Sequence, residues 1–238
     1  MSGIIAAVSS SVAKVGFSPL NIAGCVGWFD PSNATSITKD GSNNISQWND
    51  LSGSGNYGTA SGSTRPVLEN AAQNGLNTVR FTASGTQLLT LNSPIAISAA
   101  TLICVINRGG PTGSNNMLPL GNAGATPMYL FQWYIDENYY IDSPTNFTYS
   151  SSVDAATGYQ VFSVTSSGSS FSLRKNGSPI ALAAAIASIK TSGFTRIGAG
   201  GGFYSNGELG EMCLYDSVLS TGNKQLVEAY LKSKWGTP

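Results

Sequence analysis

The chain has 238 residues, of which only 10% are charged, and 12 basic side chains balance 12 acidic ones. So little charge leaves no basic surface for nucleic acid or for an anionic membrane, and we expect neither as a partner. The chain contains no histidine, which excludes the Ser-His-Asp triad and most zinc sites. A β-sandwich of this length often forms one domain, and we expect a single one.

The first 20 residues are small, Ser-rich and mildly apolar. They lack the basic region of a secretory signal, and no apolar run approaches the roughly 20 residues that cross a bilayer. We therefore expect residues 1–20 to form an arm outside a domain at residues 21–238. Export by the usual route is not expected.

Short strands are predicted at close intervals from alternating or apolar runs bounded by Gly, Asn and Ser. The candidates are residues 25–30, 45–49, 78–81, 87–91, 101–107, 128–135, 139–141, 160–165, 170–175 and 207–216. Residues 102–106 are apolar on both faces, which predicts a central strand covered on both sides. Asn176-Gly177 predicts a hairpin turn. Residues 181–187 are Ala-rich and fit either a strand or a short helix.

A C-terminal helix is predicted at residues 220–235, with Ser220 as its N-cap. Its apolar face consists of Leu226, Val227, Tyr230, Leu231 and Trp235. Gly222 in the first turn costs roughly 1 kcal/mol relative to Ala. Docking must therefore stabilise this helix more than its own propensity does.

A corner is predicted at residues 45–58, where a short strand breaks into a loop of Ser, Gly and Asn. Trp48 is the largest apolar side chain there, and Asp50 and Ser52 can hydrogen-bond to the amides of the loop. Trp48 and Asp50 are therefore expected to be structural residues.

Four motifs in order resemble those of concanavalin A-like (laminin-G-like) jelly-roll domains. They are Trp48-x-Asp50-x-Ser52-Gly53-x-Gly55-Asn56, an upstream Trp28-Phe29-Asp30-Pro31-Ser32, a downstream Asn74-Gly75 with Val79-Arg80-Phe81, and Gly210-Glu211 followed by apolar residues and the helix that ends at Trp235. The resemblance covers roughly residues 22–236 and implies an all-β, concanavalin A-like antiparallel sandwich with a C-terminal helix. It also implies structural roles for Trp28 and Trp235.

A calcium site is implied by the same resemblance, because such sandwiches often hold this ion with carboxylate, amide and backbone oxygens. Asp30, Asp50 and Asn56 are the expected ligands. The alternative is that these side chains hydrogen-bond their own loops. No other cofactor is expected.

Catalytic carboxylates are not expected. Glycosidases of this fold family carry a Glu-x-Asp-x-x-Glu strand, and the chain has no such spacing. Asp136 and Glu137 are adjacent, so on a strand they point to opposite faces and cannot flank one glycosidic bond. We therefore predict that the protein is not an enzyme and has no catalytic residues.

An aromatic segment is the best functional lead, because sugar rings stack on Tyr and Trp faces. The expected glycan contacts are Tyr129, Trp133, Tyr134, Tyr139 and Tyr140. The alternative is sandwich core, and it applies most strongly to Phe131. It applies less to Tyr139 and Tyr140, since adjacent strand residues face opposite ways.

Three cysteines, Cys25, Cys104 and Cys213, lie among apolar residues in predicted strands. At least one of them cannot pair within the chain, and we expect all to be buried thiols. The chain therefore does not require an oxidising compartment.

The resemblance is closest to stand-alone copies of the domain in bacteriophage and large-virus structural proteins. It implies a non-enzymatic virion surface protein, either a tail adhesin or fibre or a capsid decoration, assembled in the host cytoplasm. The expected partners are other virion proteins, through the N-terminal arm, and host surface glycans, and we expect a homo-oligomer. The alternative is a carbohydrate-binding module of a secreted bacterial protein.

Overall fold

The computed structural model describes residues 16–108, 117–123, 131–133, 139–141, 148–149, 157–167, 171–182 and 193–238. These residues form antiparallel sheets and, within the described ranges, one α-helix, α2 (Thr221–Trp235). Short 3₁₀ helices lie at η1 (Pro19–Asn21), η2 (Gly62–Thr64) and η3 (Ala83–Gly85).

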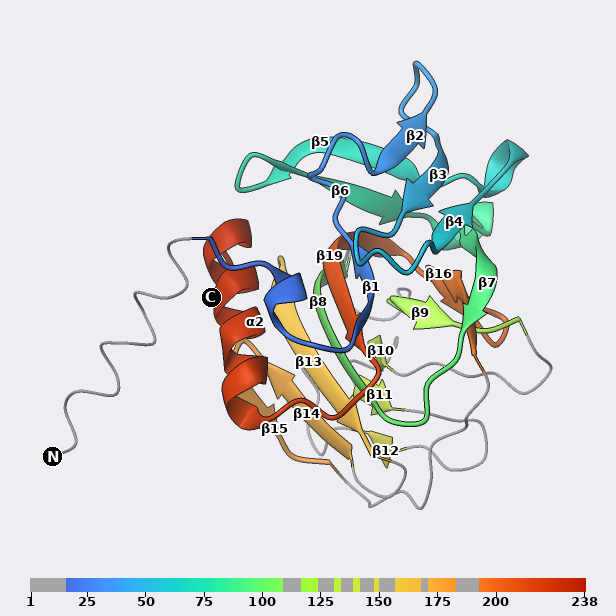
Figure 1. Ribbon diagram of the computed structural model, residues 1–238. Helices are drawn as coiled ribbons and strands as arrows, with labels where there is room; N and C mark the ends of the chain where they lie inside the picture. Colours follow the sequence, from blue (N-terminus) through green and yellow to red (C-terminus); the bar gives the residue numbers. More distant parts are fainter. Residues whose placement is uncertain are drawn as a thin grey trace, which may run out of the picture.

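Two large sheets build the sandwich (Figure 1). The strands of the eight-stranded sheet are β1 (Cys25–Phe29), β5 (Val67–Gln73), β6 (Leu76–Phe81), β8 (Ala100–Arg108), β13 (Gln160–Ser166), β14 (Phe171–Lys175), β15 (Ser178–Ile180) and β19 (Gly207–Tyr215). Those of the six-stranded sheet are β2 (Ile37–Lys39), β3 (Ile45–Asn49), β4 (Tyr57–Thr59), β7 (Leu89–Ile95), β9 (Leu120–Gly121) and β16 (Phe194–Ile197). Two smaller sheets contain β10 (Gln132–Trp133), β11 (Tyr139–Ile141) and β12 (Thr148–Tyr149), and β17 (Ala199–Gly200) and β18 (Phe203–Tyr204).

The strand order of the larger sheet is β15-β14-β13-β8-β19-β6-β5, and β1 pairs with β19 beside β6. The smaller of the two large sheets has the order β2-β3-β4-β7-β16-β9. All these pairings are antiparallel. The predicted fold class, an all-β antiparallel sandwich with a C-terminal helix, is confirmed.

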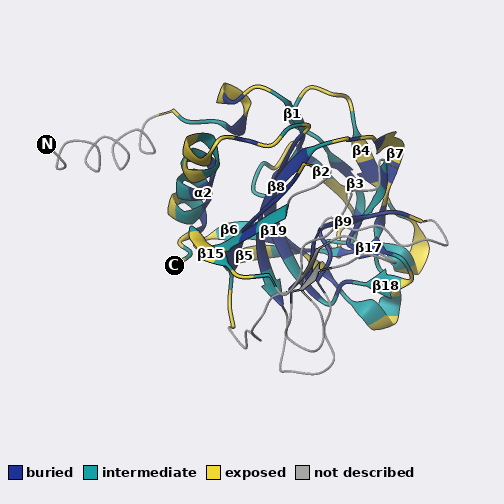
Figure 2. Cartoon of the chain, turned by 90° about the horizontal axis from the view of Figure 1, so that it is seen from below, coloured by how far each residue is buried: buried dark blue, intermediate teal, exposed yellow. Residues whose placement is uncertain are grey.

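Strand β8 is the central strand that the sequence predicts, and Figure 2 shows it buried along its length. Leu102, Cys104 and Ile106 face the core between the two sheets. Ile103 and Val105 face the opposite way, into a second apolar cluster with the helix α2. Because the sheet buries both faces here, an unbroken apolar run is what this strand requires.

Helix α2 begins and ends as the sequence predicts. The Ser220 side chain accepts a hydrogen bond from the Asn223 amide, and Gly236 ends the helix with a left-handed backbone at φ 62°. Val227, Leu231 and Trp235 are buried, while Leu226 and Tyr230 are partly buried against them. The helix therefore lies on the outer face of the larger sheet, against β8 and β13 (Figure 1).

The predicted hairpin turn at Asn176-Gly177 joins β14 to β15. Both residues have positive φ, 50° and 86°, which favours Asn and Gly and matches the twist of the flanking strands. Residues 183–190, which hold most of the Ala-rich run, lie outside the described residues.

The end of the predicted N-terminal arm packs on the domain. The Phe17 ring lies 5.5 Å from that of Tyr230, and the Tyr215 hydroxyl donates to the Pro19 carbonyl at 3.0 Å. Contacts with the domain thus begin before residue 20, and residues 1–15 lie outside the described part of the chain. Among the helices of that part, none has the length and apolar character to span a bilayer.

Candidate functional site

The aromatic segment contributes a small three-stranded sheet, β10-β11-β12. Trp133 pairs with Tyr139, and Tyr140 pairs with Gln132 on one side and Tyr149 on the other. Of the predicted glycan contacts, Tyr129 and Tyr134 lie outside the described residues. For Trp133 and Tyr140 only the backbone is described.

Tyr139 faces the sandwich core. It is 1% exposed, and its ring lies 5.9 Å from that of Phe131 and 4.9 Å from that of Phe162 on β13. Phe131 and Phe162 are themselves fully buried with their ring centroids 4.9 Å apart. The prediction that Tyr139 stacks on a sugar is therefore wrong, because its ring is packed against other rings. Phe131 follows the alternative that the sequence left open for it.

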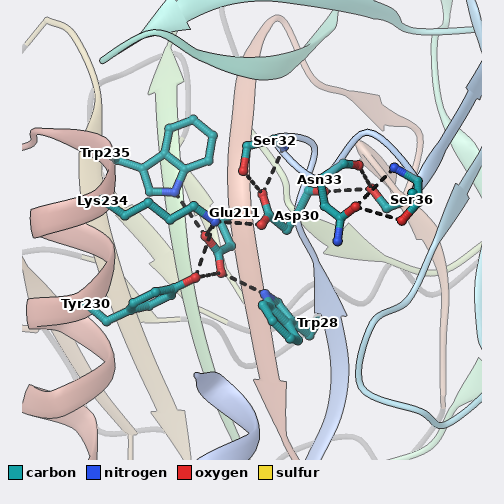
Figure 3. A network of polar contacts seen from close by, with 10 residues as sticks. Trp28, Asp30, Ser32, Asn33, Ser36, Glu211, Tyr230, Lys234 and Trp235 are labelled. Carbon is teal, nitrogen blue, oxygen red and sulfur yellow. Dashed lines mark hydrogen bonds and ion pairs between the residues drawn. The ribbon is translucent and has the colours of Figure 1, made fainter. Parts of the chain in front are cut away.

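A buried polar network around Glu211 joins helix α2 to the sheet (Figure 3). Glu211 is 0% exposed. Its Oε1 accepts from Trp28 Nε1 at 2.7 Å and from the Tyr230 hydroxyl at 2.9 Å. Its Oε2 accepts from Lys234 Nζ at 2.6 Å and from Trp235 Nε1 at 3.2 Å. The carboxylate thus has four protein donors, as a buried charge requires.

A β-bulge aims Glu211 at the helix. Leu209 pairs with Ile106 and Met212 with Cys104, so Gly210 and Glu211 stand opposite the single residue Val105. Leu209 and Met212 both face the inner core; without the extra residue, the alternation would place position 211 in that core as well. The bulge instead turns the Glu211 carboxylate to the outer face. It lies where β19 leaves β6 and begins to pair with β1.

Lys234 completes the network from the last turn of α2. Its ammonium lies 2.6 Å from Asp30 Oδ2 as well as 2.6 Å from Glu211 Oε2. Burial alone lowers the pKa of Lys234, but the carboxylates of Glu211 and Asp30 outweigh it, and the net pKa is raised. Burial, and then the charge of Asp30, raise the pKa of Glu211 against the opposing effect of Lys234. All three side chains are committed to one another, which makes the network a structural one.

The predicted calcium ligands are held by hydrogen bonds within the protein. Asp30 Oδ1 accepts from the Ser32 amide at 2.9 Å and from its hydroxyl at 2.7 Å. Asp50 accepts from the amides of Trp28 and Ser52 at 2.7 and 2.8 Å. Asn56 donates to the Val26 carbonyl at 3.3 Å. In the described ranges no group of three or more His, Cys, Asp or Glu side chains is placed to hold a metal. Asp30 and Asp50 thus bond amides of their own loops, as the alternative states, while Asn56 bonds β1, and calcium stays a prediction.

The tryptophans lie in structural positions. Trp48 and Trp235 are fully buried, and the Trp48 ring packs edge-on against Phe29 with centroids 5.6 Å apart. The backbone of Trp28 connects the corner to β1, since its amide donates to Asp50 and its carbonyl accepts from Leu51 at 2.7 Å. The three cysteines are free thiols, with Cys104 and Cys213 buried and Cys25 half-buried.

Lys234 and Tyr230 are site residues that the sequence analysis missed. The sequence pattern places Tyr230 on the apolar face of the helix and does not single out Lys234. The sequence does contain a Glu within an apolar strand and, on the C-terminal helix, a Lys four residues after a Tyr. A buried carboxylate needs a cation or several donors, but nothing in the spacing identifies which one.

No protein-family model matches the chain, and no curated protein matches it. Solved structures do match. Trypanosoma rangeli sialidase in complex with the inhibitor DANA is similar over 93% of this chain and 36% of the sialidase chain, with a TM-score of 0.61 and 14% identity. The same sialidase as a covalent intermediate with 2,3-difluorosialic acid is similar over 97% of this chain and 38% of that chain, with a TM-score of 0.59 and 13% identity.

The receptor binding domain of botulinum neurotoxin D is similar over 93% of this chain and 57% of that chain, with a TM-score of 0.59 and 12% identity. The chain therefore spans about a third of the sialidase chains and rather more than half of the neurotoxin domain. At these identities the likeness establishes a shared fold.

The prediction that the protein is not an enzyme is contradicted by these matches, because sialidases are enzymes. Lack of histidine and of one carboxylate spacing excludes the mechanisms that need those groups, whereas Tyr, Asp and Glu remain in the chain and can act in other ways.

Proposed function

We propose that this protein binds glycans on the surface of a virion, and that the aromatic segment of β10, β11 and β12 makes the contact. The sandwich supplies a rigid scaffold, and the segment contains Tyr and Trp residues, which combine an apolar face with a polar group for sugar hydroxyls.

The observation that carries the proposal is the anchoring of this small sheet. Tyr139 and Phe131 fix it to Phe162 of the larger sheet from the inside. Tyr140 is the next residue on β11 and pairs with Tyr149 on β12. Strand β11 thus has a buried anchor, Tyr139, next to a second aromatic residue, Tyr140. Such an anchor can preorganise a stacking surface for a sugar.

The similar structures support glycan chemistry for this fold. They include a receptor binding domain and a sialidase in complex with sialic acid. Each stacking contact contributes on the order of 1 kcal/mol beyond area burial, so one site binds weakly. Many copies on a particle raise the overall affinity through avidity.

A glycan array probed with multimerised protein tests the proposal. We expect wild type to bind and Tyr140→Ala to lose binding. Trp133→Ala tests whether Trp133, which pairs with the buried Tyr139, contributes as well. Tyr57→Ala is the matched control, because Tyr57 is an exposed tyrosine, at 38%, on β4 of the other sheet. Absence of wild-type binding, or full binding by both variants, would contradict the proposal. Chromatography of the bound glycan after incubation shows whether it has been cleaved.

The virion location rests on the sequence resemblance, the low charge and the free thiols. It is tested by mass spectrometry and immunogold labelling of purified particles. Labelling at the tail supports an adhesin or fibre, and labelling over the shell supports a capsid decoration. Recovery of the protein only from the medium of a bacterial culture would favour the carbohydrate-binding module of a secreted protein.

A further inference from the structure

A hollow of about 300 Å³ lies beside the edge strand β15, between the β14–β15 hairpin and the first turn of α2. It is lined by Phe171, Ser172, Leu173, Arg174, Pro179, Ile180, Leu182 and Lys224. This volume is at the lower end of the range for small-molecule sites. It suits a single sugar unit better than a chain of them.

The polar side chains of the hollow lie on its helix side. Arg174 pairs with Pro179 across β14 and β15, so the two side chains share a face. Ser172, two residues before Arg174, shares that face as well. Helix α2 packs there, because Arg174 Nε lies 2.8 Å from Glu228 Oε1.

The two cations of the hollow differ in their partners. Arg174 is neutralised by Glu228 and also donates to the Gly177 carbonyl. Lys224 is half-buried, and its ammonium makes no hydrogen bond or ion pair within the part of the chain that the structure describes. None of the lining residues that the structure describes is acidic. Among its described lining residues, the hollow therefore carries one uncompensated positive charge. The Ser172 hydroxyl, which is hydrogen-bonded to that of Thr165, lines it as well.

The remaining lining residues are apolar. Pro179 offers aliphatic surface on the same face as Arg174, whereas Phe171, Ile180 and Leu182 line the hollow from the core side of the sheet edge. A ligand that satisfies both parts of the hollow has a carboxylate on one side and an apolar C–H face on the other. A pyranose ring with a carboxylate group has this combination.

We propose that the hollow is a second saccharide site that takes a carboxylated sugar, with its carboxylate on Lys224 and its ring against Pro179. This inference rests on the proposed glycan-binding function, but it uses a different surface from the aromatic segment. The aromatic segment selects for a stacking face, whereas this site selects for negative charge.

Titration of the ¹⁵N-labelled full chain with monosaccharides, followed by NMR, tests this site. The probes are glucuronic acid and N-acetylneuraminic acid, with glucose and N-acetylglucosamine as neutral counterparts. We expect the acidic sugars to shift the amide signals of β14, β15 and the first turn of α2. The neutral sugars should leave these signals unchanged.

Lys224→Glu should weaken binding of the acidic sugars at least tenfold. The variant should fold, because the first turn of α2 has no acidic residue and a carboxylate is favourable at a helix N-terminus. Lys39→Glu makes the same charge change at an exposed lysine on β2 and should bind like wild type. Equal weakening of binding in both variants would show that the effect comes from the net charge of the protein and not from a contact with Lys224.

The inference is overturned if no acidic sugar shifts these signals, if Lys224→Glu binds like wild type, or if glucose binds as well as glucuronic acid. Glycan-array binding that depends on Tyr140 but not on Lys224 would leave the proposed function standing and remove this site. Loss of array binding with retained NMR shifts would remove the proposed function of the aromatic segment and leave this site standing.

Discussion

Lys234 Nζ and Glu211 Oε2 lie 2.6 Å apart and connect the last turn of α2 to the bulge of β19. Asp30 Oδ2 lies at the same distance from the same ammonium. Three segments distant in the sequence, the end of β1, the bulge and the C-terminal helix, therefore meet at one cation. The helix is positioned both by its apolar face and by this polar contact.

Replacing Lys234 with Met should lower the free energy of unfolding. The change leaves Glu211 with no cation in a site that is 0% exposed. Breaking a buried ion pair costs about 3–5 kcal/mol, and we expect about 3 kcal/mol because the Lys234 side chain is 21% exposed. Urea unfolding measures this loss of stability, with Lys39→Met as a control at an exposed lysine.

A double-mutant cycle with Glu211→Gln isolates the coupling. Gln keeps the shape of the side chain and removes the charge, so the double variant should lose less than the sum of the two single losses. Strictly additive losses would show that the two residues stabilise the fold independently.

Alkaline pH should destabilise the protein partly through Cys25. Burial, and then the charge of Asp50, raise the pKa of Cys25 from 9.0 to about 12. The folded state keeps this proton at pH values where the unfolded chain has lost it. The contribution is therefore fully present below pH 9.0 and is lost as the pH rises to about 12.

Urea unfolding at a series of pH values from neutrality to about 12 measures this loss of stability. Burial also raises the pKa values of Tyr215 and Tyr230, so both wild type and Cys25→Ser should lose stability above pH 9. The slope should be shallower for Cys25→Ser, because serine does not titrate there. Parallel curves would mean that the Cys25 proton is not linked to folding.

The sequence predicts the parts of this fold that local patterns determine. The β8 run is apolar on both faces because the sheet is covered on both sides, and Ser220 and Gly236 mark the ends of α2 through capping rules that need no tertiary information. The bulge at Gly210-Glu211 is not visible in the same way, since it depends on register with β8. The partnership of Glu211 with Lys234 follows from that bulge and so could not be read from spacing.

The same limit explains Tyr139. Its aromatic neighbours in the sequence indicate a stacking surface, but whether a ring points inward depends on how β11 sits on the sandwich. The residue that decides this, Phe162, lies on β13. Asp30, Asp50 and Asn56 likewise fit a metal site in composition, while Asp50 and Asn56 bond the backbone of β1, 22 and 30 residues away in the sequence.

Trp48→Ala should lower the free energy of unfolding by about 3–5 kcal/mol, because it removes a fully buried ring from the core and leaves a cavity beside Phe29. Tyr57→Ala, on the neighbouring strand β4, should have a much smaller effect since Tyr57 is 38% exposed. Thermal or urea unfolding compares the two. A soluble Trp48→Ala protein with an unchanged melting temperature would remove the structural role.

Two Gly→Ala changes should act in opposite directions. A Cβ at Gly210 would lie 3.1 Å from Val105 Cβ and 3.2 Å from the Trp235 ring, so Gly210→Ala should push α2 outward and cost about 1–3 kcal/mol. A Cβ at Gly222 in the first turn of α2 would meet nothing within 4 Å. Gly222→Ala should therefore stabilise by up to about 1 kcal/mol through helix propensity. Equal effects of the two changes, measured by urea unfolding, would contradict the close packing of Trp235 on Gly210.

The last prediction separates the N-terminal arm from the domain. Phe17 packs on Tyr230, and Pro19 accepts a hydrogen bond from the buried Tyr215 hydroxyl. A deletion through residue 21 removes both contacts, uncovers part of the cluster under α2 and leaves that hydroxyl without its acceptor, so the melting temperature should fall. A deletion of residues 1–15 spares these contacts and should leave the melting temperature unchanged. If the arm binds neighbouring subunits, as we expect from the sequence, the shorter deletion should still abolish self-association in sedimentation and incorporation into particles. Normal assembly of the shorter deletion would assign subunit contacts to the domain itself, and equal melting temperatures for the two deletions would show that Phe17 and Pro19 contribute nothing to the fold.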